Sequence, residues 1–112
     1  MKVETIKDAL EFKKAYTNLI KFMLDRDFLI TVLADGSEEL IKSNDYKSIK
    51  DSVESMDETE IIIYEKNGRR IGWALIIPYN GDEDSVSDWT ISPTMDLWDN
   101  EYQKLINELE VA

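Results

Sequence analysis

The sequence IIIYEKNGRRIGWALII, residues 61–77, contains the strongest fold signal in this 112-residue chain. Two apolar runs flank Asn67-Gly68, and an Asn-Gly pair in that setting favours a two-residue type I′ turn. Pro78 follows the second run and ends the ladder, because proline has no N–H to donate. We therefore predict an antiparallel hairpin that is central to a sheet.

A two-residue loop determines which residues of this hairpin lie opposite one another. Counting back from the turn predicts three favourable pairs: Glu65 with Arg70, Tyr64 with Ile71, and Ile62 with Trp73. On the other face of this hairpin, large residues are expected to lie opposite small ones. Ile61 and Ile63 are on one strand, and Gly72 and Ala74 are on the other. The small residues leave room for another backbone, so we expect a helix to approach that face closely.

A second hairpin precedes the first in the chain. Apolar residues alternate with a period of two in residues 28–33, and Asp35-Gly36 follows as another type I′ signal. The return strand runs through Leu40 and Ile41. After a polar loop, residues 86–91 are expected to add a short edge strand.

The N-terminal helix has the clearest helical pattern. Thr5 followed by Asp8 resembles a capping box, and apolar residues then recur at helical spacing as far as Leu24. We predict one continuous helix there. Ile6, Leu10 and Leu24 widen its apolar arc beyond what one sheet contact needs.

Two further helices are expected. The first begins after a cap at Ser43 or Asn44 and ends near Asp57. The second begins at Ser92-Pro93, a cap followed by proline at the first helical position. Its apolar stripe contains Met95, Trp98, Tyr102, Leu105, Ile106 and Leu109.

These elements predict one α+β domain that spans residues 1–112. The expected order is helix, hairpin, helix, hairpin, edge strand, helix. An antiparallel sheet of four to five strands with three helices packed on it follows, in two layers.

The composition narrows the function classes. The chain has no Cys and no His, which removes thiolate metal sites, cysteine nucleophiles and histidine acid-base chemistry. The net charge is −11, so we expect no direct binding to nucleic acid or to an anionic membrane. There is no apolar run of the roughly 20 residues that span a bilayer and no N-terminal signal pattern, so a cytoplasmic location is expected.

The acidity is concentrated in the second half of the chain. Residues 81–112 contain nine acids and a single base, Lys104. Four acids crowd the loop before the last helix, and Asp96 and Asp99 are neighbours on the helix itself. The candidate partner-binding residues are Asp82, Glu83, Asp84, Asp88, Trp89, Asp96, Asp99 and Glu101.

Two interpretations of this acidity are open. In the first, the acids are the solvated face of a soluble protein, with Asp96 and Asp99 also favoured near a helix N-terminus. Alternatively they imitate the phosphates of duplex DNA, which also offers closely spaced negative charge. In acidity and size, though in no motif, the chain resembles the small phage-encoded inhibitors that block restriction or CRISPR nucleases as DNA mimics.

The aromatic residues are expected mostly in the core. Trp73 and Trp98 fall on predicted inward faces, whereas Trp89 and Tyr79 flank the acidic loop and are expected to be exposed. The small basic spot at Arg69 and Arg70 is interpreted as solvation of a strand end.

Metal and cofactor sites are not expected. The loop from Asp82 to Asp88 has oxygen ligands at alternate positions, as a calcium loop does. Its sixth position is Ser87 instead of glycine, and its twelfth is Pro93 instead of glutamate. Paired carboxylates acting as a hydrolase are a third hypothesis, for which a domain of this size offers little room.

We therefore predict a non-enzymatic module whose acidic second half binds a basic surface on another protein, such as a nucleic-acid-binding enzyme that it inhibits. The alternative is a small structural or homo-oligomerising domain. It would form a homodimer through an apolar face on the first helix or on the sheet.

Overall fold

The computed structural model describes residues 5–111. In this range the chain forms four α-helices, one 3₁₀ turn (η1) and five strands. In chain order they are α1 (Ile6–Phe12), α2 (Ala15–Asp25), β1 (Leu29–Ala34), β2 (Ser37–Ser43), α3 (Tyr46–Glu54), β3 (Thr59–Tyr64), β4 (Arg70–Ile76), η1 (Glu83–Ser85), β5 (Val86–Trp89) and α4 (Pro93–Val111).

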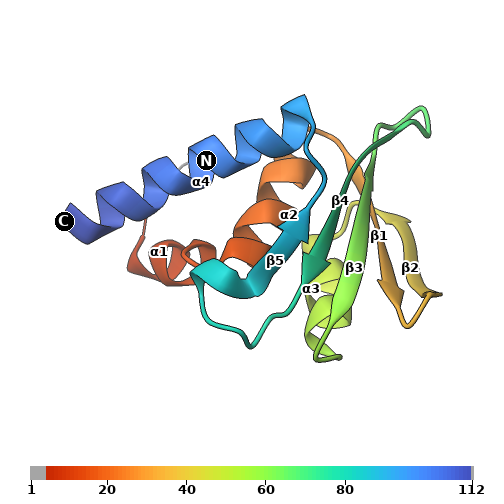
Figure 1. Cartoon of the computed structure of the whole chain (residues 1–112), viewed down its shortest axis with the longest axis horizontal. Coiled ribbons are helices and arrows are strands. Elements are labelled where there is room, and N and C mark those ends of the chain that lie inside the picture. Colours follow the sequence, from red (N-terminus) through yellow and green to blue (C-terminus); the bar gives the residue numbers. More distant parts are fainter. Residues whose placement is uncertain (1–4, 112) are drawn as a thin grey trace.

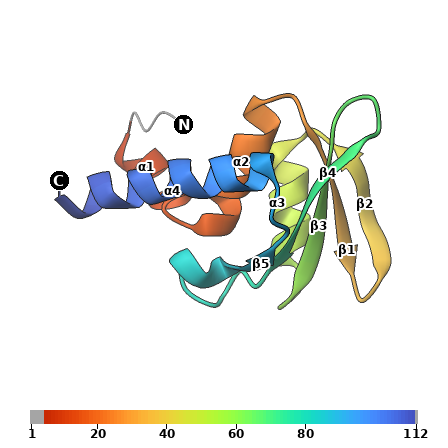
Figure 2. The same ribbon diagram turned by 45° about the horizontal axis from the view of Figure 1, so that its top comes forward.

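The strands form one antiparallel sheet in the order β2-β1-β3-β4-β5. Helices α2, α3 and α4 lie on one side of it and leave the other side open (Figure 1; Figure 2). This arrangement confirms the predicted two-layer α+β fold, including the edge strand β5. The covered side holds the core, where the sheet contributes Ile30, Val32, Ile61, Ile63, Ala74 and Ile76.

The predicted first helix is two helices, so the expectation of one continuous helix was wrong. The cap was right, since the Thr5 side chain accepts a hydrogen bond from the N–H of Asp8 at 3.0 Å. The chain then breaks at Lys14, which has the extended dihedrals φ −73° and ψ 127°. No Gly or Pro marks this break, and the apolar period continues across it.

The break is stable because other groups satisfy the freed backbone. The Thr17 hydroxyl donates to the carbonyl of Glu11, and the Asn18 amide donates to that of Phe12 at 2.9 Å. At the start of α2, the N–H of Ala15 donates to the carbonyl of Asp82 at 2.8 Å. These partners come from six residues further along the chain and from Asp82, next to the distant η1, which local sequence patterns do not report.

The turn of the β1-β2 hairpin has the predicted geometry. Asp35 and Gly36 have φ angles of 51° and 78°, as a type I′ turn requires, and Ala34 pairs with Ser37.

The β3-β4 hairpin reaches its predicted register by a different route. The N–H of Glu65 donates to the carbonyl of Arg69 at 2.8 Å, so the loop has three residues and Gly68 takes the left-handed position with φ 92°. A bulge at Ile71 then absorbs the extra residue. Ile62 therefore pairs with Trp73 as predicted.

Beyond the bulge, towards the turn, the predicted pairs were wrong. Tyr64 pairs with Arg70 instead of Ile71. Glu65 forms its ion pair with Arg69, at 3.8 Å, instead of Arg70.

The predicted helix starts were partly right. Asp45, and not Ser43 or Asn44, caps α3, because its carboxylate accepts the N–H of Ser48 at 2.9 Å. The helix ends at Glu54, before the expected Asp57. The start of α4 is as predicted: the Ser92 hydroxyl accepts the N–H of Met95 at 3.3 Å, and Pro93 is the first helical residue.

The close approach expected at Gly72 is confirmed, but the expected position of Trp73 was wrong. A Cβ on Gly72 would lie 3.1 Å from Sδ of Met95, so α4 packs directly on the glycine. Trp73 is on the opposite, open side and is only half-buried. Alternation along β4 requires this, because Gly72 and Ala74 occupy the covered side.

Candidate protein-binding surfaces

Three of the predicted site residues surround the N-terminus of α2. Asp82, Glu83 and Asp84 are exposed in or next to η1. Ser85 fixes this turn, since its hydroxyl accepts the N–H of Tyr16 at 3.1 Å and donates to the carbonyl of Asp82 at 2.9 Å. The acids therefore lie at the positive end of a helix dipole, where negative charge is favoured.

The field of these acids extends to α4. The buried Tyr102 donates its hydroxyl to the carbonyl of Lys13, at the junction of α1 and α2. Burial raises the pKa of Tyr102, and the charges of Glu83, Asp82 and Asp84 raise it further. The η1 acids and the middle of α4 are thus electrostatic neighbours.

The acids of α4 lie on two flanks of its buried stripe. Successive residues of an α-helix are rotated by about 100° around its axis. Asp99 therefore lies on the same flank as Asp96, whereas Glu101, about 200° around the axis from Asp99, lies on the other flank. Glu110, on the same flank as Asp99, lines a hollow with Glu83. Glu110 therefore lies near η1, whereas Asp99 and Asp96 lie on the same flank about three and four turns nearer the start of α4.

Asp88 and Trp89 point to opposite sides of the edge strand β5. Trp89 pairs with Ala74 on the covered side and contacts Trp98 edge-on, with ring centroids 5.7 Å apart. The expected exposure of Trp89 was wrong, because this contact half-buries it. Asp88 pairs with Leu75 and is exposed on the open side of the sheet.

The structure thus gathers part of the predicted site. Asp82, Glu83 and Asp84 lie together at η1, and Asp96 and Asp99 share one flank of α4. We call these five residues the acidic surface. Asp88, Trp89 and Glu101 lie elsewhere. Among residues 5–111, Lys13 is the one base within 4.0 Å of a carboxylate of this surface, at 3.6 Å from Asp82.

A second surface is the open side of the sheet, which the sequence analysis named as an alternative without identifying its residues. We call this the open face. Its apolar residues are all half-buried and project from β1, β3 and β4: Leu29, Leu33, Ile62, Tyr64, Trp73 and Leu75. No helix covers them (Figure 1; Figure 2).

One end of the open face is acidic. Residues that pair across all five strands form a row that alternates acid and leucine: Glu38, Leu33, Glu60, Leu75 and Asp88. A hollow of about 360 Å³ lies along this row, and Asp35, Glu58 and Trp73 also line it. The indole N–H of Trp73 donates to the Glu60 carboxylate at 3.0 Å.

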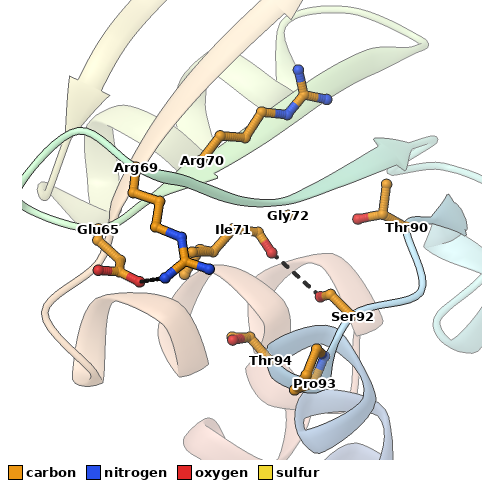
Figure 3. Close-up of a pocket in the computed structure, with 9 residues that line it drawn as sticks. All are labelled: Glu65, Arg69, Arg70, Ile71, Gly72, Thr90, Ser92, Pro93 and Thr94. Carbon is orange, nitrogen blue, oxygen red and sulfur yellow. Dashed lines mark hydrogen bonds and ion pairs between the residues drawn. The ribbon is translucent and has the colours of Figure 1, made fainter.

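The other end of the open face is basic. The ammonium of Lys42 lies 5.0 Å from the ring centroid of Tyr64, and Arg70 pairs with Tyr64 across the ladder. Arg69 and Arg70 leave β4 in opposite directions: Arg69 extends toward Glu65, and Arg70 extends away from it (Figure 3). Arg70 therefore belongs to the open face and Arg69 does not.

The hollow drawn in Figure 3 lies between the β3-β4 hairpin and the start of α4, with a volume of about 590 Å³. Three charged residues line it: Arg69 lies 3.8 Å from Glu65 and offsets its charge, and Arg70 lies at the rim and extends away from Glu65. The Ser92 hydroxyl, another polar group that lines the hollow, donates to the carbonyl of Ile71 at 3.3 Å. This hydrogen bond joins the start of α4 to β4.

Of the three residues that widen the predicted apolar arc of the first helix, two are exposed and one is packed against the core. Ile6 and Leu10 are 81% and 65% exposed on α1. Leu24 packs against the core instead. Tyr79 is 68% exposed, as predicted, although its hydroxyl donates to the carbonyl of Glu54 at 2.6 Å.

The shifted pKa of Glu11 arises where two helices contact one another. Burial raises the pKa of Glu11, but hydrogen bonds from Lys50 and Tyr46, both at 2.8 Å, outweigh it and lower the pKa below its ordinary value. These groups join α1 to α3, so their shifts have a structural cause. Within the described residues, no three carboxylates are grouped so that they could hold a metal ion.

Comparisons with protein-family models, with curated proteins and with solved structures find no match for this chain. Of the helices within residues 5–111, none has the length and apolar character needed to cross a membrane. The functional argument therefore rests on the surfaces themselves.

Proposed function

We propose that this protein is a non-enzymatic binding module whose acidic surface engages a basic surface on another protein. The partner class that fits this charge is a nucleic-acid-binding enzyme, which the module inhibits by occupying the site that receives phosphates. The observation that supports the proposal is the exposed acidic turn of Asp82, Glu83 and Asp84 at η1, with Lys13 as its one close base among residues 5–111. Asp96 and Asp99 add negative charge on one flank of α4.

Charge alone gives this surface its expected behaviour. Exposed carboxylates attract a basic partner over a distance and speed association, and salt screens that attraction. Raising the salt concentration should therefore slow association more than it speeds dissociation. Duplex DNA should compete with the module for the partner, because both present closely spaced negative charge.

Charge reversal tests the proposal. The test variant changes Asp82, Asp84, Asp96 and Asp99 to Lys. The control changes four exposed acids outside the acidic surface to Lys, Glu39, Asp51, Asp57 and Glu108, so both variants have the same net charge. Circular dichroism and thermal melting first establish that both variants are folded.

Binding is then measured by surface plasmon resonance to a partner recovered with the wild-type chain. The proposal predicts that the test variant loses binding, while the control keeps most of it and DNA displaces the wild type. Equal binding by the test variant and the wild type, with the same salt response, would show that these acids only solvate the protein.

A further inference from the structure

We propose that the open face is a dimer interface, on which two copies of this chain pack face to face with their strands antiparallel. This inference is independent of the acidic surface, which lies around η1 and α4. It specifies the homo-oligomerising alternative by naming the surface, the symmetry and the contacts.

The first support is the apolar content of the open face. Leu33, Ile62, Trp73 and Leu75 are half-buried on the side of the sheet that no helix covers within the described chain. A contiguous apolar area bounded by charged residues is typical of an interaction surface. Two such sheets can pack at about 10 Å and interdigitate these side chains.

The second support is the charge at the two ends. The acidic end presents Glu38, Glu60 and Asp88, and the basic end presents Lys42 and Arg70. A two-fold axis in the plane of the face and perpendicular to the strands brings the basic end of each copy over the acidic end of the other. The face is therefore complementary to itself, as a two-fold dimer interface must be.

This symmetry predicts particular contacts. The axis keeps β4 over β4, so the Arg70 end of one strand lies over the Leu75 end of the other. Glu60 and Asp88 flank Leu75 on the neighbouring strands. The hollow of about 360 Å³ at this end can receive the guanidinium of Arg70 beside the indole of Trp73, where a cation–π contact is favourable.

The same charge pattern disfavours other occupants. An anionic membrane or nucleic acid meets repulsion at the acidic end, and a uniformly basic protein meets repulsion at Arg70 and Lys42. Strands about 4.8 Å apart give the face a flat area of about 400 Å². Packing two copies would bury about 800 Å² in total, below the roughly 1,000 Å² that a stable interface clears, so we expect a weak, transient dimer that forms at tens of micromolar and above.

Analytical ultracentrifugation across this concentration range tests the proposal. The basic-end variant, Lys42→Glu with Arg70→Glu, places acid over acid at both symmetry-related contacts. Its dissociation constant should rise by about tenfold or more. The matched control is Arg69→Glu, which alters the neighbouring arginine on the other side of β4 and should dimerise as the wild type does.

A complementary variant makes the test specific. The acidic-end variant, Glu38→Lys with Asp88→Lys, should also lose self-association. Mixed in equal amounts, the two variants should form a heterodimer, because each reversed end then meets a reversed end of opposite sign. A monomeric wild type at the highest concentration, unchanged dimerisation of the basic-end variant, or failure of the mixture to associate while both variants are folded would overturn the proposal.

Discussion

The two sides of the sheet differ in what their residues contact. On the covered side, Ile61, Ile63 and Ala74 are completely buried against helices, and Gly72 admits Met95 at van der Waals distance. On the open side, the residues between them, Ile62 and Trp73 among others, remain half-exposed. The same strands supply both sets, because side chains alternate along them.

The difference predicts that substitutions on the two sides affect two different properties, stability on one side and the proposed self-association on the other. The covered side is uncharged and tightly packed, so changes there should act on folding. The open side combines apolar residues with five charged ones arranged by sign: Glu38, Glu60 and Asp88 at one end, and Lys42 and Arg70 at the other. Changes there should act on association.

The largest expected effect contrasts the tryptophans of the two sides. Trp98 is buried, stacks on Tyr102 and donates its indole N–H to Asn18 at 3.1 Å. Trp98→Ala should lower the free energy of unfolding by about 3–5 kcal/mol, because it leaves a large cavity. Trp73→Ala should cost only about 1 kcal/mol, since water already reaches the ring. Urea unfolding at low micromolar concentration measures both, and equal losses would contradict the comparison.

A smaller effect is expected at the contact between Gly72 and Met95. Gly72→Val places methyl groups where Sδ of Met95 lies, and such overpacking costs about 1–3 kcal/mol. Met95→Ala in the Gly72→Val background should cost less than it does in the wild type, because the two changes compensate in volume. Purely additive losses in this double-mutant cycle would mean that the helix does not approach the sheet at Gly72.

The fold was largely predictable because its signals are local. Asp35-Gly36, Asn67-Gly68 and Ser92-Pro93 each specify a turn or a cap through residues within one turn of the chain. The break at Lys14 was not predictable, since Asp82 supplies part of its compensation from far along the sequence. The bulge at Ile71 was not predictable either. Counting residues back from Asn67-Gly68 assumes a two-residue loop, whereas the loop has three residues.

The candidate site was less predictable than the fold. Composition located the acids, but the position of η1 at the start of α2 depends on contacts between residues far apart in the sequence. The open face also required the strand order, because its acidic row draws Glu38, Glu60 and Asp88 from three separate strands. The one usable signal was Gly72, whose small size could have assigned Trp73 to the uncovered side.

The smallest expected effect concerns one hydroxyl on the covered side. Thr59 is 2% exposed, and its Oγ1 has no hydrogen-bond partner among residues 5–111. Thr59→Val should raise the free energy of unfolding by about 1 kcal/mol, because it removes an unsatisfied polar atom at similar volume. The control is Thr31, equally buried, whose Oγ1 accepts the N–H of Lys42 at 3.0 Å. Thr31→Val should destabilise, and the same sign at both sites would contradict the argument.

The most direct test of the separation between the two sides uses the indole N–H signals of the three tryptophans. Two-dimensional ¹H–¹⁵N spectra recorded on dilution from millimolar to low micromolar concentration report each ring separately. The account predicts that the Trp73 signal moves as the dimer dissociates, whereas the buried Trp98 signal stays in place, and that Arg70→Glu combined with Lys42→Glu fixes Trp73 at its dilute position. A Trp73 signal that does not change with concentration, or a Trp98 signal that moves as much, would contradict it.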